Sequence, residues 1–141
     1  MSHMYFDTFI AVADDCTTDV AKVPQPRGSK KTVAEVQFAM LDGQPFVHTM
    51  EDVLFHSWLD RRDDIDATEL ADDEVQAMRD EYFSTGRACL RASPLTKTHG
   101  WGVLFDSEGR AALVASESDD YQRHLHDPGL TVLNAMRSKR A

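Results

Sequence analysis

The sequence predicts a single α+β domain, with a mainly antiparallel sheet of about four or five strands and three to four helices packed on it. The chain has 141 residues, 42% hydrophobic and 28% charged, which is the size and composition of one globular domain. Its predicted elements run in the order strand, three helices, three strands, short helix and strand. Sequential strands are therefore expected to pair antiparallel with the helices on one side, in one domain spanning residues 1–141.

The first predicted element is a central strand. Tyr5–Ala13 is rich in aromatic and β-branched residues and is apolar on both alternating faces at its centre, as in a strand covered on two sides. Residues 14–31 hold Pro24, Pro26 and Gly28 among polar residues, a composition that breaks helix and strand alike. We expect residues 14–31 to form a long surface loop.

Capping signals predict the next two helices. Thr32 followed by Glu35 forms a capping box, and apolar residues recur at helical spacing until Gly43, which predicts a helix from about Val33 to Asp42. Thr49 can cap a second helix, whose first turn carries acidic residues against the positive end of the helix dipole.

An acidic segment leads into a third predicted helix. Residues 60–81 hold ten acidic and three basic residues, a balance of −7 that accounts for most of the formal net charge of −9. Residues 60–70 are expected to form an acidic loop. Acidic residues at 72–74 and an apolar stripe that includes Tyr82 then predict a helix with Gly86 as its stop.

From residue 88 onward the pattern changes to strands. A turn at residues 106–109, with Gly109 in a left-handed position, predicts a hairpin. The predicted elements are strands at Cys89–Ser93, Trp101–Asp106 and Arg110–Ala115, a short helix at Asp119–Leu125, and a strand or short helix at Leu130–Met136.

Composition excludes several classes of partner and location. The net charge of −9 opposes general affinity for nucleic acid or anionic lipid. No stretch approaches the roughly 20 apolar residues of a membrane span, and the N-terminal residues lack the basic region, apolar run and small-residue cleavage site expected of an export signal. Cys16 and Cys89 form no Cys-x-x-Cys pair, so reduced thiols are expected. These observations predict a cytoplasmic protein with no nucleic acid and no membrane as partner.

Four stretches of the sequence are distinctive enough to compare with known families. They are Phe6–Ile10 with Asp14–Cys16, Glu51–Phe55, Cys89–Leu95 through Gly100–Gly102, and the ending Met136-Arg137-Ser138-Lys139-Arg140-Ala141. Together they resemble a family of small, uncharacterised bacterial proteins classed as a domain of unknown function. The resemblance spans almost the whole chain, and it implies a single-domain bacterial protein without implying a reaction.

A polar cluster around Trp101 is the main candidate for a ligand-binding site. Its members are Arg91, Ser93, Lys97, His99 and Trp101. If the strands Cys89–Ser93 and Trp101–Asp106 are neighbours, Arg91 and Trp101 face one side and can hold an anion against an aromatic wall. Gly100 and Gly102 would let a ligand or a backbone segment approach closely. The alternative interpretation is an arginine paired with the acidic helix, a solvated lysine and a core tryptophan.

The basic C-terminal ending extends this candidate site. Arg137 and Lys139 are basic residues on an acidic chain, which invites contact with a phosphate or an acidic surface. The alternative is a frayed tail that is solvated or pairs with the protein's own carboxylates.

The sequence contains no complete motif for binding a metal ion or a dinucleotide cofactor. His124 and His126 are two positions apart and so do not share a helix face, and with Asp127 they complete no ligand set. Gly100-Trp101-Gly102 lacks the third glycine and the helix start of a dinucleotide site. No metal and no cofactor is predicted.

Three functions therefore remain open. The leading hypothesis is a small binding module for an anionic small molecule or an acidic peptide, because basic and aromatic residues cluster on an acidic chain. An enzyme is the second, a small hydrolase or transferase that uses His99 as base near Ser93 or Cys89. A structural or homodimeric protein that associates through a sheet edge is the third.

Overall fold

The computed structural model describes residues 5–62, 64, 69–84 and 89–137. These residues form one α+β domain, as predicted. Its elements are β1 (Thr8–Ala11), α1 (Val33–Leu41), α2 (Met50–Leu59), α3 (Asp72–Tyr82), the 3-10 helix η2 (Leu90–Ala92), α4 (Pro94–Lys97), β2 (Trp101–Phe105), β3 (Ala111–Ala115), α5 (Asp119–Leu125) and β4 (Thr131–Asn134).

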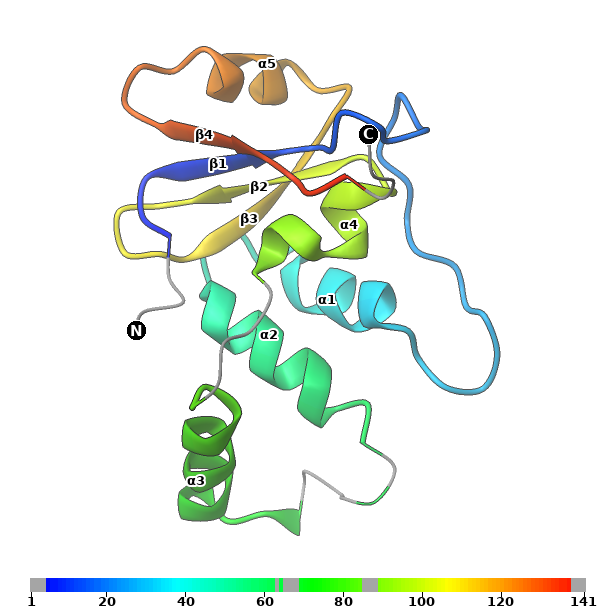
Figure 1. Cartoon of the computed structure of the whole chain (residues 1–141), viewed down its shortest axis with the longest axis vertical. Coiled ribbons are helices and arrows are strands. Elements are labelled where there is room, and N and C mark those ends of the chain that lie inside the picture. Colours follow the sequence, from blue (N-terminus) through cyan, green and yellow to red (C-terminus); the bar gives the residue numbers. More distant parts are fainter. Residues whose placement is uncertain (1–4, 63, 65–68, 85–88, 138–141) are drawn as a thin grey trace.

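The four strands form one mixed sheet in the order β3-β2-β1-β4 (Figure 1). β2 pairs antiparallel with both β1 and β3, so the predicted hairpin is confirmed and the sheet is mainly antiparallel. β4 differs from the expectation, because it lies parallel to β1 at the far edge of the sheet. A parallel strand needs a long crossover, and the segment that contains α5 carries the chain across the sheet from β3 to β4.

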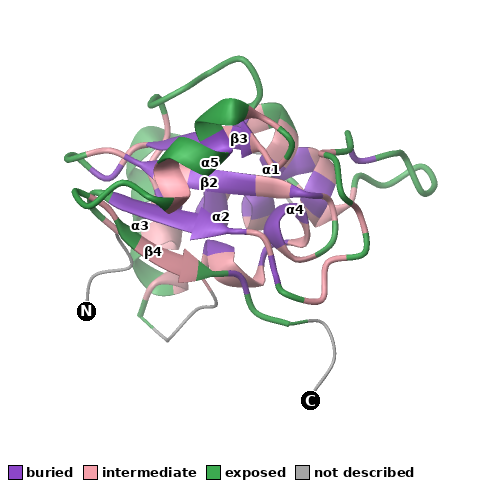
Figure 2. Cartoon of the chain, turned by 90° about the horizontal axis from the view of Figure 1, so that it is seen from above, coloured by how far each residue is buried: buried purple, intermediate pink, exposed green. Residues whose placement is uncertain are grey.

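Consecutive residues of β1 point to opposite faces of the sheet, and both faces are covered. Ile10 belongs to the main core with Val103 and residues of α1 and α2. Phe9 packs instead on Tyr121 of α5, with their ring centroids 5.2 Å apart. The expectation that helices lie on one side of the sheet is therefore wrong. As expected of a central strand, β1 is buried along its whole length, while β4 at the edge is not (Figure 2).

The two predicted capping boxes are confirmed. The Thr32 hydroxyl accepts a hydrogen bond from the Glu35 backbone N–H at 3.3 Å, and the Glu35 carboxylate accepts one from Thr32 N at 2.7 Å. Thr49 and Asp52 make the same exchange at the start of α2. These bonds are local in sequence, so the sequence pattern is sufficient to predict both helix starts.

The predicted strand at Cys89–Ser93 is wrong, because this segment forms η2 and leads directly into α4. Ser93 caps α4, its hydroxyl accepting from Leu95 N at 3.1 Å, and Pro94 occupies the first helical position. Thr96 Oγ1 donates back to the Leu90 carbonyl at 2.8 Å. Local hydrogen bonds to the Ser93 and Thr96 side chains thus take the place of hydrogen bonds to a neighbouring strand. Pro94, which follows the segment, has no N–H to donate to such a strand and favours the start of a helix.

α3 has no buried residue, and its last residue, Tyr82, packs against the main core from outside. An ion pair of 2.9 Å between Arg79 and Asp52 holds it to α2, and the Tyr82 ring lies 5.1 Å from that of Trp58. Burial alone would raise the pKa of Asp52, but the hydrogen bond from the Thr49 backbone and the Arg79 guanidinium outweigh it and lower this pKa below its ordinary value. Asp52 is therefore held ionised against α3.

Several sequence predictions fall on the segments outside the described ranges. The predicted acidic loop 60–70 includes residues 63 and 65–68, and the predicted helix stop Gly86 lies in 85–88, all outside the described residues. The described loop 14–31 contains neither helix nor strand. Among the helices that the structure describes, none has the length and apolar character needed to cross a membrane.

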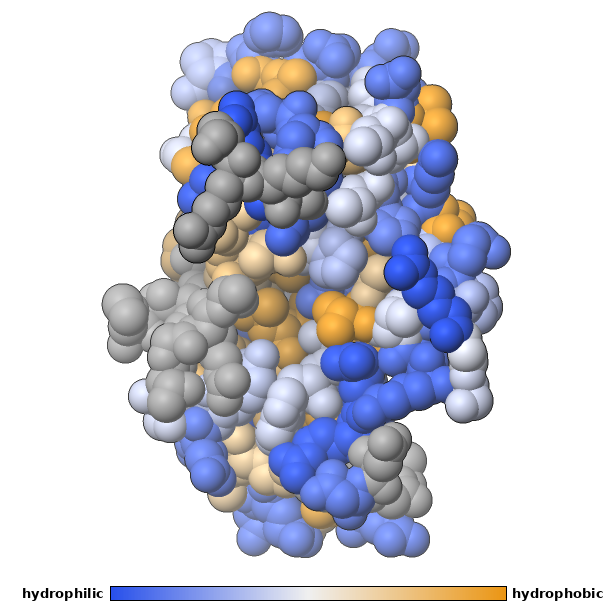
Figure 3. Space-filling view, turned by 45° about the vertical axis from the view of Figure 1, so that its right-hand side comes forward, coloured by the Kyte–Doolittle hydropathy of each residue, from blue (hydrophilic) through white to orange (hydrophobic). Residues whose placement is uncertain are grey.

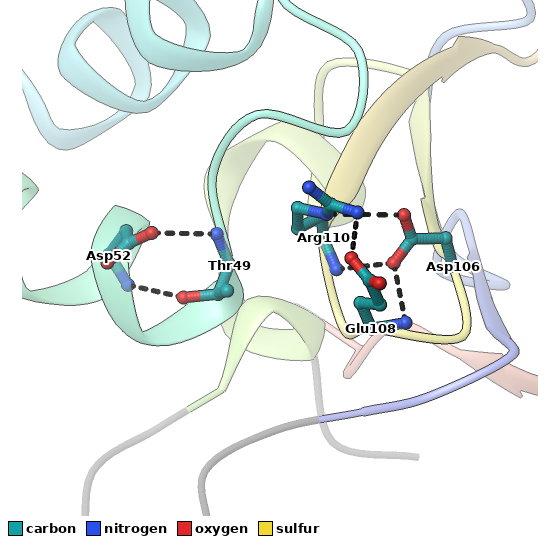
Figure 4. A network of polar contacts seen from close by, with 5 residues as sticks. All are labelled: Thr49, Asp52, Asp106, Glu108 and Arg110. Carbon is teal, nitrogen blue, oxygen red and sulfur yellow. Dashed lines mark hydrogen bonds and ion pairs between the residues drawn. The ribbon is translucent and has the colours of Figure 1, made fainter.

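The turn between β2 and β3 is held by one carboxylate. Asp106 Oδ1 accepts from the backbone N–H groups of Glu108 at 2.9 Å and Arg110 at 2.8 Å, and Arg110 also pairs with the Glu108 carboxylate (Figure 4). Thr49, the cap of α2, forms an isolated antiparallel bridge with Arg110, so the turn also contacts the start of that helix.

Replacing Asp106 by alanine is expected to lower the free energy of unfolding by about 1–2 kcal/mol, because two backbone donors lose their acceptor. Urea unfolding monitored by circular dichroism measures this loss. Asp106→Asn is the matched control, since an amide oxygen can still accept both bonds. Equal losses in the two variants would show that the charge, and not the acceptor, holds the turn.

Candidate functional site

Arg91 belongs to η2 and lies beside the C-terminal end of β4. Its Nε donates to the Asn134 carbonyl at 2.7 Å, and its own carbonyl accepts from Met136 N at 2.8 Å. Arg137 lies close by and pairs with Asp14 at 3.6 Å, while Asn134 Nδ2 donates to the same carboxylate at 2.7 Å. The sequence-predicted arginines therefore contact the protein's own carbonyl and carboxylate groups. Lys139 lies outside the described residues.

Trp101 is fixed by the loop that precedes α1. Its indole Nε1 donates to the Lys22 carbonyl at 2.8 Å, and its ring packs on Phe38 of α1 at 5.5 Å. The Lys22 N–H donates in turn to the His99 carbonyl at 2.8 Å. Trp101 thus joins β2 to the loop and to α1, and Lys97 is half-buried at the end of α4.

Ser93 lies in a buried chain of polar side chains. Its hydroxyl donates to Gln37 Oε1 at 2.5 Å, and Gln37 Nε2 donates to Ser57 Oγ at 3.5 Å. The Ser57 hydroxyl donates to the Leu54 carbonyl at 3.0 Å. Ser93, Gln37 and Ser57 are 3–5% exposed, so α1, α2 and the start of α4 are joined through this chain.

His99 lies on a cavity of about 450 Å³ between the loop, α1 and α4. Its Nδ1 is 3.0 Å from the Pro94 carbonyl. The same Nδ1 lies 2.9 Å from the Thr98 hydroxyl, so it has a partner in either tautomer, and Nε2 is left for another partner. Arg27 and Thr32 line the same cavity, while Arg91 and Trp101 do not.

The charge around this cavity favours an anion. None of the described residues that line it is acidic, although the chain carries a net charge of −9. Arg27 is exposed and makes no ion pair or hydrogen bond within the described ranges. Val33 and Ala34 also line the cavity, and the N–H groups of the first helical turn have no partner inside the helix. A guanidinium, an imidazole and a helix N-terminus therefore meet at one hollow.

This hollow lies on the side of the molecule that carries α1 and the preceding loop. Figure 3 shows that face with apolar residues in the middle and hydrophilic residues along much of the border. Sequence reasoning placed Arg27 in the surface loop and gave it no role. No local spacing relates Arg27 to His99, because they are brought together only where the loop returns to the start of α1.

The groups suggested for catalysis each have other partners. The His99 ring contacts Pro94 and Thr98. The hydroxyl of Ser93 is bonded to Gln37, and the Cys89 thiol accepts from the Tyr5 hydroxyl at 3.3 Å. Burial, with this bond to Cys89, raises the pKa of Tyr5 to about 12. The hydrogen bonds of these groups thus form no nucleophile–base pair in the described part of the chain.

The histidines near the C-terminus belong to the packing of α5. The His124 ring lies 5.4 Å from that of Phe9, and burial followed by the Arg123 charge lowers the pKa of His124. Across residues 5–62, 64, 69–84 and 89–137, no three side chains of the histidine, cysteine or acidic types are grouped so that they could hold a metal ion.

Comparison with known proteins gives one match. The model of a family described as a family of unknown function (DUF6157) matches residues 1–141. No curated protein and no solved structure matches the chain.

Proposed function

The chain belongs to this family of unknown function, and we propose from its own residues that it is a small binding module for an anionic small molecule. The site is the cavity lined by Arg27 and His99. The observation that carries the proposal is an arginine that pairs with no described residue and lies beside a histidine and a helix N-terminus. Their hollow has no acidic side chain among its described lining residues, on a chain of net charge −9.

Each lining group suits an anion of the carboxylate or phosphate class. The Arg27 guanidinium offers a planar pair of donors, and His99 can donate from Nε2 when it is protonated. Thr32 and Thr98 line the same cavity. The Glu35 carboxylate accepts from the Thr32 N–H at 2.7 Å, and the Glu35 N–H donates to the Thr32 hydroxyl, so the helix donors offered to an anion are the N–H groups of Val33 and Ala34.

The size of the cavity favours a small molecule over an acidic peptide. A volume of about 450 Å³ falls within the range of small-molecule pockets. The basic groups that would extend the site along a peptide, Arg91 and Arg137, lie at the end of β4 and contact Asn134 and Asp14.

Calorimetric titration with inorganic phosphate, citrate and glucose 6-phosphate tests the proposal. At least one of these anions should bind, and Arg27→Gln should weaken its binding at least about tenfold, since a hydrogen bond to a charged group contributes about 1.5–3 kcal/mol. His99→Gln should weaken the same anion. Arg91→Gln is the matched control, with the same substitution at an arginine outside the cavity, and should leave binding within about twofold.

Two results would contradict this function. One is the absence of saturable binding of all three anions up to about 10 mM. Even a weak specific site should be largely filled at about that concentration. The other is an anion whose affinity falls in Arg91→Gln and is unchanged in Arg27→Gln, which would move the site to the end of β4.

A further inference from the structure

A second cavity, of about 340 Å³, lies between α1, α2 and the segment from Cys89 to Pro94. Three of its lining residues are the buried polar side chains Gln37, Ser57 and Ser93. Three others, Leu54, Trp58 and Tyr82, form apolar and aromatic walls. The cavity adjoins the one lined by Arg27 and His99, because Val33 and Pro94 line both, but its chemistry is different.

Gln37 is the only one of the three polar side chains with hydrogen-bonding capacity of both kinds left over. The Ser93 hydroxyl donates to Gln37 and accepts from Leu95 N, so its single donor is used and only an acceptor lone pair remains. The Ser57 hydroxyl donates to Leu54 O and accepts from Gln37. The Gln37 amide has two N–H donors and two oxygen lone pairs, of which its bonds to Ser57 and Ser93 use one each.

The free donor and acceptor of Gln37 belong to one planar amide group that is 3% exposed. A partner that satisfies both must present an acceptor and a donor side by side, as a carboxamide or a lactam does. A carboxylate offers acceptors alone and would place its charge against the Gln37 oxygen, and burying an unpaired charge is costly. The buried end of the cavity thus favours an uncharged amide.

The walls of the cavity suit a flat ring. Trp58 and Tyr82 both line the cavity, and their rings contact each other, with centroids 5.1 Å apart and a tilt of 43°. Arg61 also lines the cavity, and its Nε donates to the Lys31 carbonyl at 3.1 Å. No acidic side chain is found among the described lining residues.

We infer that this second cavity binds an uncharged planar ring bearing a carboxamide or lactam group, with the amide edge against Gln37 and the ring against Trp58 and Tyr82. This site is separate from the anion site proposed above and does not depend on it. A site built around a buried amide discriminates strongly against analogues that leave one of its hydrogen bonds unmade.

Three probes of nearly equal shape test the inference in calorimetric or saturation-transfer NMR titrations. Benzamide carries both donor and acceptor, acetophenone lacks the N–H donors, and benzoate carries a charge and lacks a donor. Benzamide should bind saturably in the millimolar range, and acetophenone and benzoate should each bind at least about tenfold more weakly.

Two variants place the binding in this cavity. Ala92→Leu adds bulk to a half-buried lining residue and should weaken benzamide at least about tenfold, while urea unfolding confirms that the variant is folded. Should that variant fail to fold, Trp58→Leu removes the aromatic wall and should weaken benzamide about threefold to tenfold. Arg27→Gln, which affects the other cavity, should leave benzamide binding unchanged.

Equal affinity for benzamide, acetophenone and benzoate would overturn the inference, and so would the absence of saturable benzamide binding. Benzamide binding that falls in Arg27→Gln and persists in a folded Ala92→Leu would assign the ring to the first cavity and would also overturn it. Loss of anion binding alone, with benzamide binding intact, would count against the proposed function and leave this site standing.

Discussion

Replacing Gly100 by alanine should lower the free energy of unfolding by about 2–4 kcal/mol. Gly100 has φ +79°, a conformation that costs a residue with a side chain about 1 kcal/mol or more. An added Cβ would also lie 2.7 Å from the Val20 carbonyl oxygen and 3.0 Å from Thr18 Cγ2. The oxygen belongs to backbone, so the clash is relieved only by moving the loop away from β2.

Gly43→Ala is the matched control for this substitution. Gly43 has φ +72°, and an added Cβ there meets nothing within 4 Å. Both variants carry the conformational cost, and only Gly100→Ala carries the clash. Urea unfolding of the two proteins should show a loss of about 1 kcal/mol for Gly43→Ala. Losses of equal size would mean that the loop moves away at little cost and that its contact at Val20 contributes little to the free energy of unfolding.

The glycines around Trp101 show what a sequence pattern can and cannot predict. From the absence of a side chain, a ligand or a backbone segment is expected close to Gly100 and Gly102. What approaches is the protein itself, the Val20 backbone at Gly100 and the Phe9 and Tyr121 rings at Gly102. A glycine thus predicts a close contact without identifying its partner, because the partner comes from a distant part of the chain.

Local signals explain the elements that the sequence predicts well. The capping boxes at Thr32 and Thr49 depend on residues three positions apart, so a short stretch of sequence is sufficient to predict them. The segment after Cys89 has the same kind of signal in Ser93 and Pro94, which start α4. Giving that signal more weight than the apolar character of the segment would have avoided the incorrect strand.

The candidate sites depend on contacts that no local pattern contains. His99 is among the sequence-predicted residues, but its cavity partner Arg27 is 72 positions away in a loop without periodicity. Arg91 is close to His99 in sequence and contacts the end of β4 instead. Because β4 pairs parallel with β1, it brings Asn134 and Arg137 to Arg91, and that topology is not expected from the order of elements alone.

Ser93→Ala is the second substitution with a large expected effect, a loss of about 2–3 kcal/mol in the free energy of unfolding. The variant removes the cap of α4, which contributes about 1 kcal/mol, and leaves Gln37 Oε1 buried without its 2.5 Å hydrogen bond. Ser84→Ala is the control, because the exposed Ser84 hydroxyl donates only to the Glu81 carbonyl, and should cost less than about 0.5 kcal/mol.

A double-mutant cycle with Gln37→Leu separates the buried bond from the helix cap. Gln37→Leu alone leaves the Ser93 hydroxyl buried with its donor unpaired, whereas Ser93→Ala with Gln37→Leu removes both partners. The double variant should therefore be more stable than the sum of the single losses predicts, by about 1–2 kcal/mol. Strict additivity would mean that Ser93 acts through the α4 cap alone. A coupling of the expected size would identify Ser93 as a structural partner of Gln37 and explain why its hydroxyl is not available as a nucleophile.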